Sequence, residues 1–169
     1  MDNIHYINTQ VLSLETLEEI ISHHKLLELS EEAKINIQKC REYLDKKMAM
    51  HSSPIYGINT GFGSLCNVKI STENLSKLQE NLVKSHSCGT GEEVPNEIVK
   101  LMLLLKIQSL SYGHSGVQLV TVDRLIDFYN NDIIKWSINK NGDYICDNFK
   151  IGNDTSNIKI DSSTENICD

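Results

Sequence analysis

The chain has 169 residues, 40% of them hydrophobic and 23% charged, which is the composition of a globular protein able to bury one core. Its formal net charge of −7 argues against a nucleic-acid partner, because such partners select basic surfaces. The longest apolar stretch is too short to span a bilayer and the first residues form no signal peptide, so we expect a cytoplasmic protein that binds no membrane. Five cysteines without a C-x-x-C pair and six histidines without ligand spacing predict free thiols and no metal site.

Three helices are predicted in the first half of the chain. The first begins near Ser13, a candidate N-cap, and the second begins at Ser30, where two following glutamates suit the positive end of a helix. The third begins near Ser71 or Thr72. In each helix, apolar residues recur every three or four positions, which is the spacing of one buried stripe. The stripes are Leu14, Leu17, Ile20 and Ile21; Ala33, Ile37, Cys40, Leu44 and Met48; and Leu75, Leu78 and Leu82.

A fourth helix is predicted after Pro95, and it is apolar on most of its sides. We therefore expect it to be buried almost all round. Gly113 and Gly116 then flank a break, and a further helical run continues from Val117 to Phe128. The pattern to this point predicts a mainly α fold. The apolar positions of the fourth helix are Ile98, Leu101, Met102, Leu104 and Leu105.

The composition changes near Lys135. From residue 135 to residue 169 the chain is rich in asparagine, aspartate, serine and lysine, and it shows no sustained periodicity. Two short segments in this part favour a strand, Tyr144–Cys146 and Ile158–Ile160. We therefore expect an ordered, mainly helical region over 1–134 and a divergent, poorly ordered tail over 135–169.

A glycine-rich segment, Tyr56–Gly63, separates the second and third helices. Glycines at this density suit a loop whose backbone turns sharply or is approached closely by another group. The G-x-x-x-G-x-G spacing matches neither the dinucleotide fingerprint nor the P-loop, so a phosphate site is less favoured than a plain structural loop. Tyr56 opens the segment. A phenol acts as a base only where its surroundings stabilise the phenolate, and packing or a backbone hydrogen bond is the commoner role of a lone tyrosine.

His86 is placed at the end of the third predicted helix, directly after Ser85. On physical grounds alone, the favoured role of its imidazole is an interaction with the negative end of that helix. A part in binding a ligand is the alternative. The adjacent His23 and His24 point in different directions on the first helix, so they are poorly placed to share one metal ion.

Three blocks of this sequence resemble the conserved blocks of the aromatic amino-acid ammonia-lyase family. They occur in the family's order and at fitting distances, and the resemblance covers about residues 10 to 134. The first block is the most specific of the three. The blocks are Tyr56–Gly63 (YGINTGFG), Leu78–Gly91 (LQENLVKSHSCGTG) and Leu110–Gly116 (LSYGHSG).

The resemblance implies the N-terminal helical part of the lyase fold, with short strands and a glycine-rich loop. It also implies an aromatic amino acid as substrate, which the family deaminates without oxidation by means of an electrophilic methylidene-imidazolone. By the same resemblance Tyr56 is the base that removes a proton from the β-carbon, and Ser85 and His86 resemble the substrate-binding pair of the histidine-specific branch, which converts L-histidine to urocanate. The rest of the loop would act as a lid that excludes water; its residues are Gly57, Asn59, Thr60, Gly61, Phe62 and Gly63.

One departure from the family pattern concerns the electrophile. The family makes the methylidene-imidazolone from an internal Ala-Ser-Gly, whereas the two alanines of this chain, Ala33 and Ala49, both precede the glycine-rich loop and neither is followed by Ser-Gly. We therefore expect no such cofactor in this chain, and a lyase product truncated at about Ile134 that is inactive alone. The alternative is a non-catalytic module that binds a small ligand or a full-length lyase subunit. Family members are tetramers, so a homo-oligomer is also among the expected states.

Overall fold

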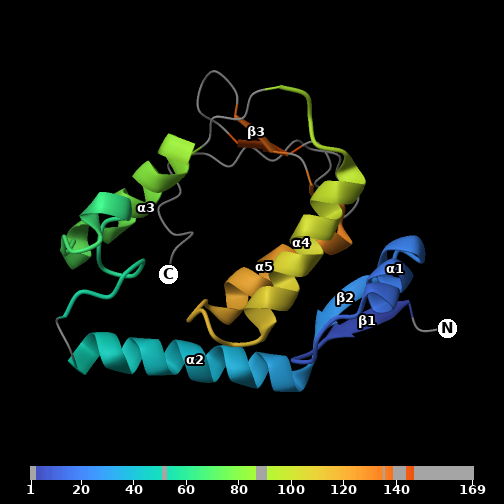
Figure 1. The fold of residues 1–169 in the computed structure, drawn as a ribbon, viewed down its shortest axis with the longest axis horizontal. Helices are drawn as coiled ribbons and strands as arrows, with labels where there is room; N and C mark the ends of the chain where they lie inside the picture. The colour runs from blue at the N-terminus through green and yellow to red at the C-terminus, as the bar shows by residue number, and fades with distance from the viewer. Residues whose placement is uncertain (1–2, 51–52, 87–90, 135, 139–143, 147–169) are drawn as a thin grey trace. The chain divides into compact units, whose positions relative to one another are not determined.

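The computed structural model describes residues 3–50, 53–86, 91–134, 136–138 and 144–146, and it confirms a mainly helical chain (Figure 1). By contact density it divides into two compact units. Unit 1 contains the described residues up to Lys46 and from Val94 onward, and unit 2 contains those from Lys47 to Glu93. The elements are β1 (Ile4–Ile7), α1 (Leu14–Ser22), β2 (Leu26–Leu29), α2 (Glu31–Met50), the 3-10 turn η1 (Gly63–Leu65), α3 (Thr72–His86), α4 (Asn96–Ser111), α5 (Leu119–Asn130), β3 (Trp136–Ile138) and β4 (Tyr144–Cys146).

Unit 1 begins with a β-α-β arrangement. β1 and β2 pair in parallel, with Ile4 opposite Leu26 and Ile7 opposite Leu29. The intervening α1 begins as predicted at Ser13, whose Oγ accepts a hydrogen bond from the backbone N–H of Thr16 over 3.2 Å. The family resemblance implied short strands, but the residue pattern did not locate these two, because each has only four residues and neither shows a clear alternation of polar and apolar positions.

A side chain from α5 closes the free edge of β2. The backbone N–H of Leu27 donates to Asn130 Oδ1 over 2.8 Å, and Asn130 Nδ2 donates to the Leu27 carbonyl over 3.0 Å. The amide group of Asn130 therefore gives Leu27 the two hydrogen bonds that a third strand would provide. Leu27 is fully buried, so these polar groups have no access to water as a substitute.

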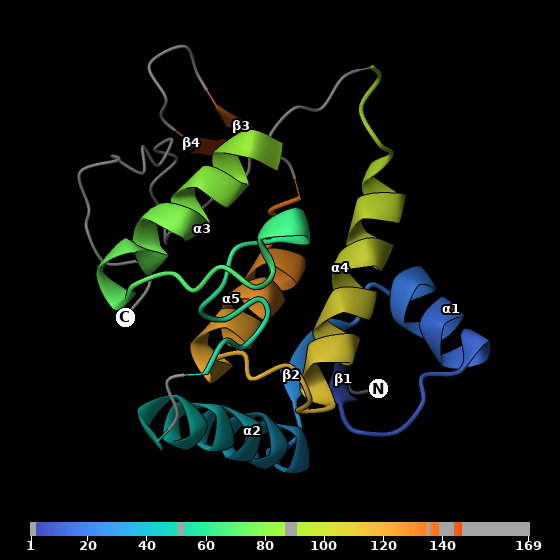
Figure 2. The same ribbon diagram turned by 60° about the vertical axis from the view of Figure 1, so that its left-hand side comes forward.

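The hydrophobic core lies between this small sheet, the three helices α1, α4 and α5, and the first turns of α2 (Figure 2). Gln108 of α4 joins the core to the β1–α1 connection, because its Nε2 donates to the carbonyls of Asn8 and Gln10 over 2.9 and 3.2 Å. All the members of the core belong to unit 1. They are Ile7, Ile20, Leu27, Leu29, Ala33, Ile37, Leu104, Ile107, Leu110, Val122, Ile126 and Tyr129.

An ion pair joins the start of α4 to the end of α5. Lys100 Nζ lies 2.5 Å from Asp132 Oδ1 and 4.9 Å from the centre of the Tyr129 ring. Burial raises the pKa of the Tyr129 phenol to about 12, and the negative charge of Asp132 acts in the same direction. Tyr129 is therefore a neutral core residue at any physiological pH.

The expectation that α4 is buried almost all round is wrong. Ile98, Met102 and Leu105 remain 49%, 62% and 44% exposed. These residues are spaced by four and three positions, so they form one stripe on a single face of the helix. The opposite face packs against α5 and β1, and the described part of the chain offers no element that covers the stripe.

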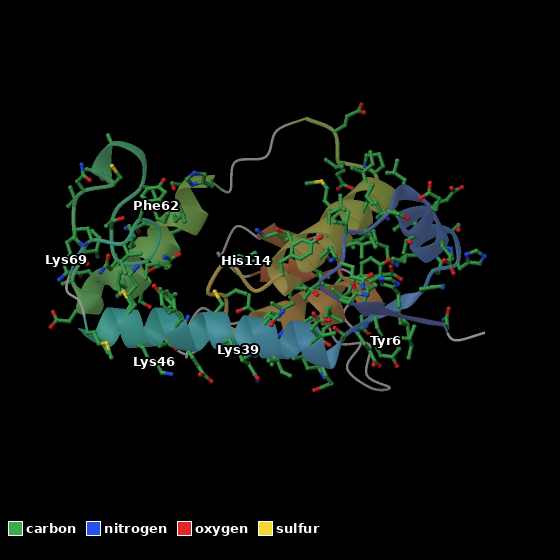
Figure 3. All side chains as sticks on the ribbon, turned by 60° about the horizontal axis from the view of Figure 1, so that its bottom comes forward. Tyr6, Lys39, Lys46, Phe62, Lys69 and His114 are labelled. Carbon is green, nitrogen blue, oxygen red and sulfur yellow. The ribbon has the colours of Figure 1, made fainter. Side chains whose placement is uncertain are left out.

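The break predicted at Gly113 and Gly116 is confirmed as the connection between α4 and α5. Gly113 has a φ of +72°, and a Cβ atom built on it would lie 2.7 Å from the backbone carbon and oxygen of Asn36 in α2. Gly113 therefore lets the connection pass directly against the backbone of α2. Figure 3 shows the neighbouring His114 on this same connection.

The predicted strand at Tyr144–Cys146 is confirmed as β4, which pairs antiparallel with β3. Ile158–Ile160 and most of the predicted tail lie outside the described residues, so the division at residues 134 and 135 stays a prediction. Among the described helices, none combines the length and the apolar character that crossing a membrane requires.

The end of α1 provides a first stability prediction. His24 follows the C-cap with a φ of +49°, while the backbone N–H of Lys25 donates to the Ile20 carbonyl over 3.0 Å. This is the position of a helix end at which glycine is favoured. We expect His24→Gly to raise the free energy of unfolding by about 0.5–1 kcal/mol, since glycine adopts this conformation without strain. Urea denaturation measures the change.

The end of α5 offers the matched control. Asp132 occupies the equivalent position with a φ of +54°, but its carboxylate also forms the ion pair with Lys100. Asp132→Gly relieves the same strain and loses that ion pair, so its gain should be smaller. A destabilising His24→Gly substitution would show that the conformation of His24 carries no strain.

Candidate functional site

The candidate site residues all lie in unit 2, and the first group is the glycine-rich loop. Its centre is Asn59, which is only 4% exposed. Asn59 Oδ1 accepts a hydrogen bond from the backbone N–H of Ile55 over 2.7 Å, and its Nδ2 donates to the Ser53 carbonyl over 3.2 Å. The Asn59 carbonyl in turn accepts from the backbone N–H of Ile70 over 2.9 Å. One buried amide therefore closes the loop upon itself and links it to the segment before α3.

The second half of the loop is held by short backbone contacts. Thr60 is fully buried, and its hydroxyl donates to the Gly61 carbonyl over 3.0 Å. The backbone N–H of Gly61 donates to the Val68 carbonyl over 3.1 Å. A Cβ atom on Gly61 would lie 2.6 Å from the Leu65 Cβ, so this glycine is required by a close approach of the chain. Asn59, Thr60 and Gly61 are the described residues of unit 2 that are buried.

Tyr56 differs from the other polar residues of its loop. Its side chain is 63% exposed, whereas Asn59 and Thr60 are turned inward and satisfied there. The Tyr56 ring meets the Phe62 ring edge to face, with 6.1 Å between centroids and an interplanar angle of 74°. Figure 3 shows Phe62 on the segment between α2 and α3. The loop therefore orients a phenol toward its surface by packing it on a second aromatic ring.

Ser85 and His86 form the second group, at the C-terminal end of α3. The Ser85 hydroxyl donates to the Leu82 carbonyl over 3.0 Å, and His86 Nδ1 lies 2.9 Å from the same carbonyl oxygen. Ser85 Oγ and His86 Nδ1 are 3.0 Å apart. The predicted interaction of His86 with the C-terminus of its own helix is therefore confirmed. A role of His86 in substrate binding stays a prediction.

A similar arrangement occurs at the end of α1, where the sequence is also Ser-His. The Ser22 hydroxyl donates to the Glu18 carbonyl over 2.6 Å, and His23 Nδ1 lies 3.0 Å from the Glu19 carbonyl oxygen. In α1 the two side chains therefore contact two different carbonyls, whereas in α3 both contact the carbonyl of Leu82. The Glu19 carbonyl also accepts the backbone N–H of His23, so the side-chain contact adds to a backbone hydrogen bond.

The last turns of α3 contain an ion pair within the helix. Lys84 forms an ion pair with Glu80, one helical turn earlier. This hydrogen bond and the charge of Lys84 hold the pKa of the Glu80 carboxyl below its usual value. Among the described residues there is no group of three or more His, Cys, Asp or Glu side chains that could hold a metal ion.

The structure brings the predicted residues together in two groups. Tyr56 contacts Phe62, and Ser85 contacts His86, but the described contacts join neither group to the other. Residues 87–90, which carry part of the second sequence block, lie outside the described residues. The role of Asn59 in a lid stays a prediction, and its side chain supports the interior of the loop. A polar residue among glycines and apolar residues was the only signal of that role.

We expect Asn59→Ala to open this loop. The substitution leaves the backbone N–H of Ile55 and the carbonyl of Ser53 without their partner, at a cost of about 1–3 kcal/mol. Amide hydrogen exchange at Ile55 and Ile70, followed by NMR, reports the loss of protection. Asn67→Ala is the control, because Asn67 is an exposed asparagine of the same segment. Equal exchange rates in the two variants would show that the Asn59 amide does not hold the loop.

Comparison with known protein families shows that most of the chain matches one family. The family model for aromatic amino acid lyases matches residues 12–142. The histidine ammonia-lyase of Streptococcus sanguinis strain SK36 is 37% identical over 147 residues, which cover 80% of this chain and 28% of that protein. The histidine ammonia-lyase of Deinococcus radiodurans is 42% identical over 123 residues, covering 73% of this chain and 23% of that protein.

Solved structures show the same partial match. Ergothionase from Treponema denticola superposes with a TM-score of 0.71 and 25% identity, over 84% of this chain and 27% of that one. Histidine ammonia-lyase from Trypanosoma cruzi superposes with a TM-score of 0.65 and 32% identity, over 76% and 24%. The chain therefore spans about a quarter of the length of these relatives. The names of these relatives refer to different substrates, so the shared fold does not identify one.

Proposed function

Because the chain belongs to the aromatic amino acid lyase family, we propose that it provides the substrate-side part of an ammonia-lyase acting on L-histidine. The observation that carries the proposal is the loop Tyr56–Gly63, in which every polar side chain except Tyr56 is used to hold the loop together. The similarity to histidine ammonia-lyases over about 80% of the chain supports the choice of substrate.

In this proposal Tyr56 accepts the proton that leaves the β-carbon of the substrate. A phenol can do so only as phenolate, which requires that water be excluded and that positive charge lie nearby when substrate is bound. The exposed position of Tyr56 on a closed loop suits a group that meets its substrate there. Ser85 and His86 would bind the substrate's ring, and buried polar complementarity of this kind discriminates strongly between ring types.

The electrophile of the family does not fit the residues present. Ala33 lies in the buried face of α2 and is followed by Lys-Ile, and Ala49 lies in the last turn of the same helix and is followed by Met-His. Neither can form the methylidene-imidazolone, which needs Ala-Ser-Gly. We therefore assign no reaction step to that group in this chain, and lyase chemistry here requires an electrophile supplied by residues other than these 169.

A hybrid enzyme tests the role of Tyr56. Residues 12–142 replace the matching region in the histidine ammonia-lyase of Deinococcus radiodurans, and urocanate formation is followed by absorbance. We expect turnover, and a fall in kcat of about 100- to 10,000-fold for Tyr56→Phe, the range that general acid–base catalysis contributes. The control is Tyr43→Phe, which alters another exposed tyrosine. A folded Tyr56→Phe hybrid with unchanged kcat would remove Tyr56 from the reaction.

The exposed stripe of α4 favours a second candidate, a non-catalytic module that binds a lyase subunit. Ile98, Met102 and Leu105 give that helix an apolar face without a cover among the described elements. A module of this kind should co-elute with a full-length lyase relative in size-exclusion chromatography, and Met102→Glu should abolish co-elution. Separate elution of the two proteins at micromolar concentration would count against it.

A further inference from the structure

We propose that the outer edge of β1 binds the same edge of a second copy of this chain, so that two small sheets join into one four-stranded sheet. In each copy β1 has β2 on one side, and its other side is the outer edge (Figure 1). Both strands belong to unit 1, whereas Tyr56 and His86 lie in unit 2. The pairing is therefore independent of the proposed function.

The hydrogen bonds between β1 and β2 show which backbone groups of β1 face outward. The carbonyls of Asn3 and Ile7 accept from N–H groups in and directly after β2, over 2.8 and 2.9 Å. Every second residue of a strand bonds the same neighbour, so Ile4 and Tyr6 direct their N–H and C=O groups to the outer edge. Within the part of the chain that the structure describes, these four groups have no hydrogen-bond partner.

β1 lacks the features that usually protect an exposed strand edge. Such edges commonly carry lysine or another charge, proline or a bulge, which prevent pairing with a further strand. The sequence of β1 is Ile-His-Tyr-Ile. Burial and the charge of Lys25 lower the pKa of His5, while Glu19 acts in the opposite direction. His5 is therefore neutral at neutral pH, and no charge on β1 opposes a second strand.

The outward groups of β1 are complementary to themselves. In an antiparallel pair, residues that face each other in alternate positions exchange both their backbone hydrogen bonds. A second β1 that places its Tyr6 opposite Ile4 engages all four outward groups of each copy. A two-fold axis then passes beside His5, and the same contacts form on both sides of it. No other antiparallel register of these two strands pairs every outward group.

The side chains beside the edge suit the same register. Ile7 points into the core, so Ile4 and Tyr6 share the opposite, outer face of the sheet. The Tyr6 side chain is 53% exposed, and Figure 3 shows it on this strand. In the paired sheet Ile4 lies directly opposite Tyr6 of the second copy. A β-branched residue opposite an aromatic one stabilises neighbouring strands.

The other edge of the sheet limits the pairing to two copies. Leu27 of β2 already bonds the Asn130 amide with both of its backbone groups. The joined sheet therefore has an Asn130 amide at each end, and neither end is open to a third copy. One strand pair is a smaller contact than the roughly 1,600 Å² of a standard interface, so we expect a weak dimer with a dissociation constant on the order of 100 µM.

Sedimentation velocity of the full chain from about 5 to about 500 µM tests the association on both sides of that constant. We expect the average mass to rise from that of one chain toward that of two. Ile4→Pro removes one outward N–H and keeps the bonds between β1 and β2, because proline is tolerated where an edge N–H faces solvent. It should raise the dissociation constant about tenfold or more, since each copy loses a hydrogen bond to the other.

Two further variants separate the edge from the face. Tyr6→Lys keeps every backbone group and adds a charge at the edge, so it should also weaken the dimer, even if Ile4→Pro fails to fold. The control is Leu26→Thr. Leu26 is 41% exposed on the same outer face, but its backbone bonds β1. This variant should associate like the unaltered chain. A loss of association in Leu26→Thr equal to that in Tyr6→Lys would overturn the pairing of edges.

Amide exchange with solvent, followed by NMR, identifies the paired groups directly. The Ile4 and Tyr6 amides should exchange about threefold more slowly at 500 µM than at high dilution, as the share of unpaired chain falls. The amides of His5 and Ile7 face β2 and should change little. A chain that stays monomeric, a dimer without this slowing, or aggregates that keep growing would overturn the inference. So would a chain that is monomeric alone but binds a full-length lyase relative through this edge.

Discussion

Replacing Gly113 by alanine is expected to lower the free energy of unfolding of unit 1 by about 3 kcal/mol. Two costs add. A φ of +72° disfavours any residue with a Cβ by about 1–2 kcal/mol, and overlap with a packed interior costs about 1–3 kcal/mol more. The overlap here involves the backbone of Asn36, 2.7 Å from the added carbon, and a helix backbone cannot rotate away. Urea denaturation followed by circular dichroism measures the loss.

Gly116 provides the matched control on the same connection. It has a similar φ of +69°, but a Cβ there would meet the end of the Leu44 side chain, which can change its rotamer. Gly116→Ala should therefore be clearly less destabilising than Gly113→Ala. If both variants lose the same stability, the approach of the connection to the α2 backbone is not as close as described.

Asn130→Ala is expected to have an effect of similar size, about 2–5 kcal/mol. The substitution leaves the buried N–H and carbonyl of Leu27 without partners, and each unsatisfied group costs about 1–3 kcal/mol. Asn130→Asp keeps an acceptor for the N–H but turns a second oxygen toward the Leu27 carbonyl, so it should also destabilise. Chemical denaturation of both variants at neutral pH gives the two values.

The adjacent asparagine is the control for this prediction. Asn131 is exposed, and its Nδ2 donates to the Asp127 carbonyl at the surface over 2.8 Å. Water can replace that bond, so Asn131→Ala should change the free energy of unfolding by less than about 1 kcal/mol. Similar losses for Asn130→Ala and Asn131→Ala would mean that the edge of β2 does not depend on the Asn130 amide.

The helices could be predicted from the sequence because their signals are local. Ser13 caps α1, and the stripe that begins at Ala33 and Ile37 does face the core. The strands β1 and β2 could not be located from the residue pattern, because they are stabilised by each other and by an amide 103 residues away from Leu27. The prediction that α4 is buried on almost all sides was wrong for a related reason. Apolar composition shows which residues favour burial, but not whether a neighbouring element exists to cover them.

In the candidate site, too, some residues could be predicted from the sequence and others could not. Tyr56, Ser85 and His86 stand in short, specific blocks, so the sequence alone could nominate them. The roles of Asn59 and of the Leu82 carbonyl could not be found there. The first depends on a loop folding back to Ser53 and Ile55, and the second on a backbone atom that is the same in every residue. The supporting groups of a site are therefore less visible in a sequence than the groups they support.

The central claim is that these 169 residues carry the substrate-side groups of a lyase and cannot form its electrophile. Incubation of the purified full chain with L-histidine, beside the hybrid enzyme at equal concentration, tests it most directly through the absorbance of urocanate. We predict urocanate from the hybrid and none from the chain alone. Turnover by the chain alone, at any rate above that of a Tyr56→Phe control, would contradict the claim.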